Sequence, residues 1–458
     1  MYNGQRHLWQ TQVLNTNEKT LIRFPLPGVV FLELLSFLNF LISVIFVCCY
    51  SYQFVYIPVV WFFKDKKAKK IKEARGDIVM HRFCAIICAR NEEKVIGDLI
   101  HSLQSQTYPQ DLLKIVVMAD NCTDSTAKIA EELGATVYTR FNDELIGKGY
   151  ALDELFQKHL NNDFPGCFDG YFIFDADNIL ANDYIERMNE KFCDGSDVIT
   201  SYRNSKNFDT NWLTAGIGLW FLRESRYLNH SRLILGTSCA VSGTGYLFSQ
   251  KVLDTYGGRW PFHLLTEDIE FSIDWISKGH KIDLCPDAVF YDEQPTKLSQ
   301  SFRQRIRWSR GYLQVLYKYF LVLMKGIFTF NFSCFDFFMN IAPAYILTLG
   351  ALGSNITLII MGLAYGDDPM IAVWSILQLF LNSYLVTFIV GLITVITEWK
   401  NINASTFKKI LSAFTFPFFM ITFIPIAVAA LFVKVKWKPI EHNDSLDERK
   451  KRGKKDKF

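Results

Sequence analysis

The sequence lacks both a large net charge and an ordered arrangement of cysteines. Its formal net charge is only +3 over 458 residues, so the whole molecule is no polyanion binder and no nucleic-acid partner is expected. No two pairs among the ten cysteines have metal-ligand spacing, and a zinc site is therefore not expected. No internal repeat is visible either. Scattered cysteines favour a reducing compartment for the soluble part of the chain.

The chain also lacks an evident cleavable signal peptide. Its first apolar segment begins near Val29, after a polar N-terminus without an adjacent basic cluster, and is typical of an anchor. Half of the residues are apolar and 40 are Phe, which is high for a purely soluble protein. The length therefore indicates one large soluble domain together with a membrane part.

Residues 29–63 are the expected membrane anchor. They carry no charge apart from Glu33 and are long enough for one transmembrane helix of ~20 residues with an interfacial extension. Seven Lys and Arg follow between Lys64 and Arg75. Because positive charge favours the cytoplasmic side, residues 64–80 are predicted to be a cytoplasmic juxtamembrane linker, with 1–28 as an N-terminal segment.

Residues 81–311 have the alternating pattern of an α/β domain. Four apolar runs predict buried strands, at Phe83–Cys88, Lys114–Met118, Ala135–Arg140 and Gly170–Phe174. Strands that alternate with helices imply a doubly wound, mostly parallel sheet, with ligands outside the carboxyl ends of its strands. The acidic motifs of this region fall at such ends, which indicates a site there.

Beyond residue 311 the chain is largely apolar. Residues 312–332 are aromatic and apolar but carry Lys318 and Lys325, and they predict an interfacial helix. Residues 333–435 form the expected C-terminal transmembrane region, with three uncharged stretches at Phe337–Ala364, Met370–Thr397 and Ile410–Val433.

The third uncharged stretch contains Pro417 and Pro425, which favours a broken or re-entrant element. Four full spans would place the basic tail, residues 436–458, opposite the central domain, against the preference of positive charge for the cytoplasm. A re-entrant or interfacial last element with a cytoplasmic tail is therefore expected.

Two carboxylates, Asp175 and Asp177, stand one residue apart at the end of the fourth predicted strand. There they can converge on one hard cation, Mg²⁺ or Mn²⁺, while one of them also reaches a ribose or phosphate. The alternative is a loop that only solvates two acids.

Other candidate site residues follow the first two predicted strands or lie between two glycines. Asp120 is expected to hydrogen-bond a base or a ribose. Asn91 and Glu92 could line the same pocket, although either could instead be a helix cap. Lys148, between two glycines, is expected to reach a phosphate rather than to be an ordinary exposed lysine.

Asp268 is the candidate general base. A sugar hydroxyl is a poor nucleophile, and a positioned carboxylate can take its proton as the new bond forms. Glu267 is the rival for this role. The alternative is a helix N-terminus that Thr266 caps and whose dipole the two acids complement. Both interpretations can hold together.

After Asp268 and a gap of 35 residues comes the pentapeptide Gln304-Arg305-Ile306-Arg307-Trp308. Arg307, with Arg305 as a second candidate, can clamp a diphosphate. Trp308 offers a face to a sugar ring and Gln304 a hydrogen-bonding amide. The alternative is a basic amphipathic stretch that docks on anionic lipid.

Four motifs stand in this order along the chain: Asp120, Asp175 with Asp177, Asp268, and the pentapeptide. They resemble the motifs of family 2 glycosyltransferases, specifically the membrane-embedded cellulose, hyaluronan, chitin and poly-N-acetylglucosamine synthases. The match covers roughly residues 80–320, and the gap after Asp268 also agrees. The resemblance implies a GT-A fold, a Rossmann-like and mostly parallel cytoplasmic domain inserted between transmembrane helices. It further implies a UDP-sugar donor, Mg²⁺ or Mn²⁺, and inversion at the anomeric carbon.

The resemblance also implies a role for each matching residue. Asp120 is expected to contact the uracil, Asp175 the nucleotide and Asp177 the metal. Asp268 is expected to deprotonate the acceptor hydroxyl, Arg307 to stabilise the diphosphate, and Trp308 to form the floor of the acceptor site. The chain departs from many relatives in having Ala119 before Asp120, where they have a second acid, and in a membrane part that is small for an enzyme that exports its polymer.

The sequence therefore predicts a hexosyltransferase of the plasma membrane with a cytoplasmic catalytic domain. It is expected to transfer a glucose- or N-acetylglucosamine-type sugar to a growing β-linked glycan. Single transfer to a lipid acceptor, as in ceramide glucosyltransferases, is the alternative, and a non-catalytic scaffold of a polysaccharide-export complex is a third. Membrane lipids and export or regulatory proteins are the further expected partners.

Overall fold

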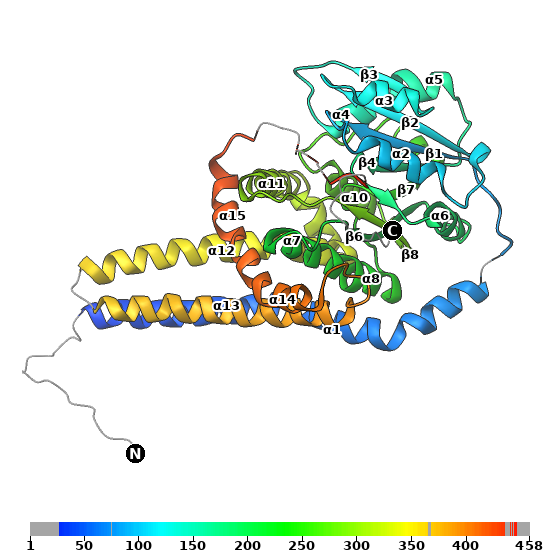
Figure 1. Cartoon of the computed structure of the whole chain (residues 1–458). Coiled ribbons are helices and arrows are strands. Elements are labelled where there is room, and N and C mark those ends of the chain that lie inside the picture. The colour runs from blue at the N-terminus through cyan, green and yellow to red at the C-terminus, as the bar shows by residue number, and fades with distance from the viewer. Residues whose placement is uncertain are drawn as a thin grey trace, which may run out of the picture.

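The computed structural model describes residues 27–74, 76–364, 368–435, 440, 442 and 444–446. The expected N-terminal segment and basic tail therefore lie largely outside the described residues. Figure 1 shows an α/β domain next to a group of long helices, some of which run side by side away from it.

Within the described residues, one eight-stranded sheet has the order β3-β2-β1-β4-β7-β6-β8-β5. Neighbours from β3 to β4 are parallel, as are β6 and β8, whereas β7 is antiparallel to both of its neighbours. The strands are β1 Phe83–Ala89, β2 Leu113–Asp120, β3 Thr136–Arg140, β4 Gly170–Asp175, β5 Ile179–Leu180, β6 Val198–Ser205, β7 Tyr246–Ser249 and β8 Asp283–Asp292. The predicted α/β class is confirmed, and the four predicted strands are β1 to β4.

Short helices connect these strands and cover the sheet. They are α2 Ile96–Gln104, η1 Gln110–Leu112, α3 Thr126–Glu132, α4 Lys148–Glu154, η2 Leu155–Leu160, α5 Asn161–Asp163, α6 Tyr184–Phe192, α7 Trp212–Arg223, η3 Glu224–Asn229, α8 His230–Leu235, α9 Gln250–Thr255 and α10 Glu267–Ser277. The π-helical turn η3 joins α7 directly to α8.

Both faces of the sheet are covered, which explains why its central strands are apolar along their whole length. In β1, Cys84 and Ile86 join one hydrophobic cluster, while Phe83, Ala85 and Ile87 join the other. All five side chains are fully buried. Helices α2, α3 and α6 contribute to the second cluster, and α4 and α10 contribute to the first.

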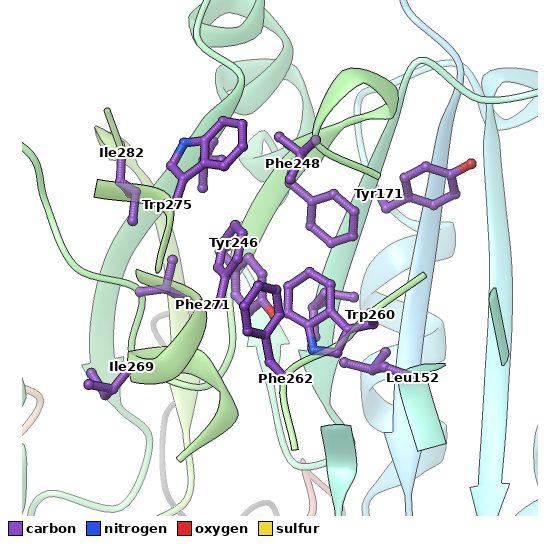
Figure 2. Close-up of a cluster of buried hydrophobic side chains, with 14 of the residues drawn as sticks. Leu152, Tyr171, Tyr246, Phe248, Trp260, Phe262, Ile269, Phe271, Trp275 and Ile282 are labelled. Carbon is purple, nitrogen blue, oxygen red and sulfur yellow. The ribbon is translucent and has the colours of Figure 1, made fainter. Parts of the chain in front are cut away.

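An aromatic group within the first cluster leads directly to the start of α10 (Figure 2). The ring of Trp260 lies 4.9 Å from that of Phe271 and 5.2 Å from that of Phe262. Such contacts add to the burial of apolar area because aromatic rings interact favourably at these separations. The chain just before Glu267 is thereby fixed to the core.

The remaining helices are longer and more apolar. They are α1 Pro27–Ala74, α11 Leu298–Phe328, α12 Phe332–Ala364, α13 Pro369–Thr397, α14 Thr406–Ile421 and α15 Phe423–Phe432. In the described part of the chain, four segments are long and apolar enough to cross a membrane: Glu33–Lys64, Phe332–Ala364, Pro369–Thr397 and Thr406–Phe432. Helices α1, α12 and α13 lie side by side (Figure 1).

Two of the expected boundaries fall inside continuous helices. Helix α1 continues from the apolar anchor through the basic run to Ala74. Helix α11 continues across residue 311, so the expected interfacial helix is the second half of the helix that carries Arg307 and Trp308. In both cases the composition changes without a proline or loop at the boundary, and a helix has no reason to end there.

The last apolar stretch is broken at Thr422, between α14 and α15. Arg305 of α11 donates a hydrogen bond of 2.6 Å to the Thr422 hydroxyl. Its guanidinium also lies 4.6 Å from the ring centroid of Phe419 and 4.9 Å from that of Phe423. Pro417 lies inside α14, whereas Pro425 follows the break by three residues and has no N–H to bond the carbonyl of residue 421. The break therefore coincides with this contact and with Pro425. The re-entrant arrangement stays a prediction.

Candidate active site

A cavity of about 530 Å³ lies at the carboxyl ends of β1, β2 and β4, where the strand order predicts ligand binding. Helices α4, α10 and α11 complete its walls. It is lined by every predicted site residue except Asn91, namely Glu92, Asp120, Lys148, Asp175, Asp177, Glu267, Asp268, Gln304, Arg307 and Trp308.

Asn91 fixes the loops next to this cavity instead of lining it. Its backbone has a φ of +58°, in the left-handed region that asparagine tolerates. Its side-chain oxygen accepts a 2.8 Å hydrogen bond from the backbone N–H of Thr123, and its amide donates to the Thr123 hydroxyl at 3.2 Å. This pairing holds the loop after β1 against the loop after β2 and orients Glu92.

Asp120 ends β2 and is paired with Arg140 at the end of the neighbouring strand β3. Nη1 of Arg140 donates to Oδ1 of Asp120 at 2.6 Å, and Nε of Arg140 donates to Glu154 at 2.9 Å. The Asp120 side chain is 9% exposed. Because the Arg140 bond uses Oδ1, Oδ2 of this fixed carboxylate remains for a ligand such as a base or a ribose.

Lys148 begins α4 after Gly147, whose φ of +143° only glycine adopts readily. Its ammonium group donates to Oδ1 of Asp175 at 2.5 Å and to the carbonyl of Gly243 at 2.8 Å. Burial lowers the pKa of this lysine, but Asp175 and the other acidic groups nearby, Glu267 among them, together raise it. A charged ammonium group therefore stands at the edge of the two-carboxylate motif, where it can meet a phosphate.

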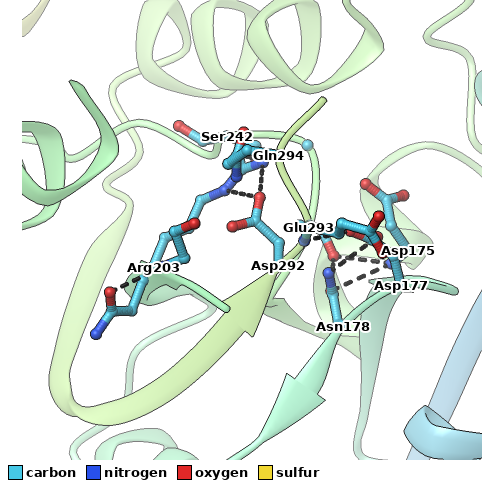
Figure 3. A network of polar contacts seen from close by, with 12 residues as sticks. Asp175, Asp177, Asn178, Arg203, Ser242, Asp292, Glu293 and Gln294 are labelled. Atoms are coloured by element: carbon cyan, nitrogen blue, oxygen red, sulfur yellow. Dashed lines mark hydrogen bonds and ion pairs between the residues drawn. The ribbon is translucent and has the colours of Figure 1, made fainter. Parts of the chain in front are cut away.

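Asp177 lies deeper in the site than Asp175 (Figure 3). Its Oδ2 accepts a 2.7 Å hydrogen bond from the backbone N–H of Glu293, which follows β8. Burial raises the pKa of Asp177, yet this pKa is lowered overall because His442, Lys206 and Arg203, with the hydrogen bond from Glu293, together outweigh burial. The carboxylate is thus ionised and held in place.

The donor set fits a hard divalent cation that is bound together with a nucleotide diphosphate. Among the described residues, no group of three or more His, Cys, Asp and Glu is arranged to hold a metal on its own. Mg²⁺ needs no such cage, because it commonly uses one or two carboxylates together with substrate phosphates and water. Asp177, with Asp175 beside it, supplies that minimum.

Sequence patterns did not identify several residues that line the cavity. Arg203 of β6 donates to Asp292 at the end of β8, through Nε at 2.7 Å, and to the carbonyl of Ser242 at 2.9 Å (Figure 3). Asp292 and Glu293 end an apolar run, the same signal that identified Asp175. His442 and Glu224 follow no such signal.

The acids Glu267 and Asp268 begin α10, as predicted. Thr266 is at the N-cap position, but its hydroxyl makes no capping hydrogen bond and is buried without a partner among the described residues. The side-chain cap by Thr266, which belonged to the alternative interpretation, is therefore wrong, although the helix does begin here. Burial and the charge of Asp268 raise the pKa of Glu267 to about 7, and burial also raises the pKa of Asp268. The pair is poised to exchange a proton near neutrality.

We expect the transfer rate to rise with pH through about 7, as the Glu267–Asp268 pair loses its proton and Asp268 becomes the stronger base. In Glu267→Gln the neighbouring charge is absent, so the pKa of Asp268 falls and the acid limb of the profile moves to lower pH. The check is kcat/KM as a function of pH for both proteins. An acid limb that stays in place in Glu267→Gln would contradict the coupling.

The pentapeptide motif lies in the first half of α11, and helical geometry explains its spacing. Gln304, Arg307 and Trp308 are three and four residues apart, share one face of the helix and line the cavity. Arg307 donates to the carbonyl of Leu265 at 3.0 Å, and Trp308 packs edge-on against Phe221. Arg305 lies on another face and contacts Thr422, so of these two candidate arginines Arg307 is the one that lines the cavity.

Comparison with known proteins agrees with this geometry. The sequence model described as "Glycosyltransferase like family 2" matches residues 81–311, half of the chain. Beta-monoglucosyldiacylglycerol synthase of Synechocystis sp. is 27% identical over 234 residues, which cover 50% of this chain and 47% of the relative. Poly-beta-1,6-N-acetyl-D-glucosamine synthase of Staphylococcus epidermidis is 24% identical over 243 residues, covering 52% and 57%.

The chain thus matches only about half of the length of these relatives. Among solved structures, a mannosyltransferase from Pyrobaculum calidifontis in complex with GDP-Man and Mn²⁺ is similar, with a TM-score of 0.48 and 16% identity over 85% of this chain and 99% of that one. The match of the family model to the whole α/β domain, with the four motifs around one cavity, shows that the chain belongs to glycosyltransferase family 2 and has its GT-A type of sheet.

Proposed function

We propose that the protein transfers a glucose- or N-acetylglucosamine-type sugar from a UDP-sugar, with inversion, to the hydroxyl of a growing β-linked glycan at the membrane. One observation carries the proposal. A single cavity joins the half-buried carboxylate of Asp268 on α10 to the two-carboxylate motif at the end of β4 and to the arginine and tryptophan of α11.

In this mechanism the donor lies with its nucleotide towards Asp120 and its diphosphate between Lys148 and Arg307. The acceptor oxygen attacks the anomeric carbon from the side opposite the diphosphate. The bond from that carbon to the diphosphate oxygen breaks, and UDP leaves with the electron pair. The acceptor proton passes to the carboxylate of Asp268. An α-linked donor thereby gives a β-linked product.

The difficult part of the reaction is the charge that develops on the leaving diphosphate. Two cationic side chains, Lys148 and Arg307, stand at the walls of the cavity where they can stabilise that charge. A divalent cation held by Asp177 would, when bound, neutralise further charge on the diphosphate. Lys148 is paired with Asp175 and would transfer to a phosphate as the donor binds.

Transfer of one sugar to a lipid is the second candidate, because the cavity reaches a candidate membrane span. Its wall includes Trp220, Phe221 and Tyr312, and it also includes Val433 directly after α15. Trp220 stacks on Phe423 of α15 with 5.5 Å between the ring centroids. A lipid hydroxyl could enter along this apolar wall, whereas the same aromatic rings could also stack on the sugars of a glycan.

The proposed location is the plasma membrane, with several spans and a cytoplasmic catalytic domain. Four candidate spans support it, as does the basic second part of α1 between the first span and β1.

The test is incubation of the purified full-length protein, in lipid, with Mn²⁺ and a panel of labelled UDP- and GDP-sugars. We expect release of UDP from UDP-glucose or UDP-N-acetylglucosamine. A ladder of products supports the glycan acceptor, and a single glycolipid supports the lipid acceptor. If no donor releases its nucleotide, the result contradicts the proposed activity and favours the non-catalytic scaffold.

A further inference from the structure

Two polar side chains in the wall of the cavity take no part in the proposed transfer. Glu224 begins the π-helical turn η3, and Tyr312 lies in the middle of α11. Both side chains are half-buried. Turns of the π-helical type are rare and occur frequently at functional sites. What Glu224 and Tyr312 can bind follows from the hydrogen bonds that each still has to offer.

Glu224 is fixed through one of its two carboxylate oxygens. The hydroxyl of Ser242 donates to Oε1, and the carbonyl of Ser242 in turn accepts a 2.9 Å hydrogen bond from Arg203. In the part of the chain that the structure describes, Oε2 makes no hydrogen bond and Glu224 forms no ion pair. A carboxylate oxygen that is held in place at a cavity is an acceptor for a hydroxyl group of a ligand.

Tyr312 supplies a donor on the opposite element. It follows Trp308 by four residues, so the two side chains share the face of α11 that lines the cavity. Its hydroxyl has no hydrogen-bond partner among the described residues. Burial raises the pKa of this phenol, and the negative charges of Glu224 and Asp268 raise it further. The hydroxyl therefore keeps its proton, and both carboxylates lie near it.

The loop that carries Ser242 places Glu224 beside the proposed general base. The carbonyl of Gly243, the next residue, accepts a 2.8 Å hydrogen bond from Lys148. A Cβ atom on Gly243 would lie 3.7 Å from Oδ2 of Asp268, which is ordinary van der Waals contact. The lysine of the donor site and the base thus meet at Gly243, and Glu224 contacts the residue before it.

Aromatic rings next to Glu224 make this part of the cavity suitable for a sugar ring. Trp220 and Phe221 precede Glu224 by one helical turn and line the cavity, and the ring of Phe221 lies 6.0 Å from that of Trp308. A sugar has apolar faces and a rim of hydroxyls, so it needs both aromatic surfaces and hydrogen-bonding groups. A diacylglycerol has only one hydroxyl. With that hydroxyl at Asp268, the polar groups of Glu224 and Tyr312 would lose water without gaining a partner.

We propose that Glu224 and Tyr312 form the polar part of the acceptor subsite and that the acceptor is a sugar ring with neighbouring hydroxyls. Oε2 of Glu224 accepts a hydrogen bond from a hydroxyl next to the attacking one, and the Tyr312 hydroxyl donates to another oxygen of the same ring. The ring is the end of a glycan or the head group of a glycolipid. This inference rests on the proposed function and restricts its second candidate to lipids that already carry a sugar.

The test compares acceptors for the full-length protein in lipid, with Mn²⁺ and the donor that it uses. With UDP-glucose the acceptors are cellotriose, octyl β-glucoside and dioctanoylglycerol. With UDP-N-acetylglucosamine the two sugars are replaced by their N-acetylglucosamine counterparts. We expect transfer to at least one sugar acceptor. In Glu224→Gln and in Tyr312→Phe the KM for that acceptor should rise about tenfold, because one hydrogen bond to the acceptor is weakened or lost. The values of kcat and of the dissociation constant of UDP should stay within about twofold, since neither side chain touches the reacting atoms or the nucleotide.

The matched controls are Glu131→Gln in α3 and Tyr317→Phe in α11, whose side chains are exposed and should not affect the KM for the acceptor. Transfer to cellotriose alone would identify a glycan end as the acceptor, and transfer to octyl β-glucoside alone would identify a glycolipid. An unchanged KM in either site variant would overturn the inference, as would a weaker affinity of Glu224→Gln for UDP. Transfer to dioctanoylglycerol and to no sugar would also overturn it, although the proposed transfer to a lipid would stand. If the unchanged protein releases UDP with no acceptor and from no donor, the proposed function itself fails.

Discussion

Asp268→Asn is expected to lower the rate of sugar transfer by about 10³-fold or more and to change the affinity for UDP little. Asparagine has nearly the same shape but cannot accept the acceptor proton. Asp268 lies at the first turn of α10, where the backbone N–H of Ile269 supports its negative charge. The measurements are kcat for release of UDP and the binding constant of UDP.

Glu267→Gln is the matched control for this prediction. Glu267 is buried and Asp268 half-buried, and both line the cavity. Because the two acids are adjacent in sequence, replacing each by its amide separates the effect of position from that of charge. Glu267 increases the basicity of Asp268, so Glu267→Gln should lower kcat about tenfold. This loss is much smaller than the one expected for Asp268→Asn. If Glu267→Gln abolishes transfer and Asp268→Asn does not, the roles of the two acids are reversed.

Sequence patterns identified the site residues whose positions follow from local geometry. Asp120 and Asp175 follow apolar strands, and parallel strands bring their carboxyl ends to one edge of a sheet. Gln304, Arg307 and Trp308 share a face because of helical periodicity alone. Each of these inferences needs only a few neighbouring residues, which is why a single sequence suffices.

The elements that patterns missed depend on distant parts of the chain. Strand β7 has only four residues, and Pro286 and Asp287 interrupt β8 and leave it a short apolar run before Asp292, so neither matches the longer run of β1. His442 meets Glu92 across 350 residues of sequence, and no local pattern reports such a contact. The predicted end of the first anchor lies beside the end of the candidate span Glu33–Lys64, and only the continuation of helix α1 to Ala74 has no signal in the composition.

The gap of 35 residues between Asp268 and the pentapeptide is closed in space by a contact between α10 and α11. Gly311 lies one turn after Trp308 and packs against Thr266, two residues before Asp268. A Cβ atom on Gly311 would lie 2.5 Å from Cγ2 and 2.6 Å from Oγ1 of Thr266, closer than real contacts allow. Because Gly311 has no side chain, α10 and α11 can approach closely, and this approach determines the distance from Asp268 to Arg307 and Trp308.

Gly311→Ala is expected to separate α10 from α11 and to reduce kcat about 100-fold, because a displacement on the order of 1 Å between catalytic groups has effects of this size. The loss of thermal stability should be small by comparison, since alanine favours the helix. The measurements are kcat for UDP release and the unfolding temperature in lipid. Gly350→Ala in α12 is the control, because a Cβ there would meet nothing within 4 Å.

A second substitution tests whether the contact between residues 311 and 266 causes the loss of kcat in Gly311→Ala. Thr266→Ala removes both Cγ2 and Oγ1, and it leaves no hydrogen bond unmade because the Thr266 hydroxyl has no partner among the described residues. The double variant Thr266→Ala/Gly311→Ala keeps the Cβ of residue 266, 3.0 Å from the new Cβ, and should therefore recover part of the rate lost in Gly311→Ala. A double-mutant cycle measures the coupling between the two sites. If the double variant is as slow as Gly311→Ala, the distance between α10 and α11 is set elsewhere.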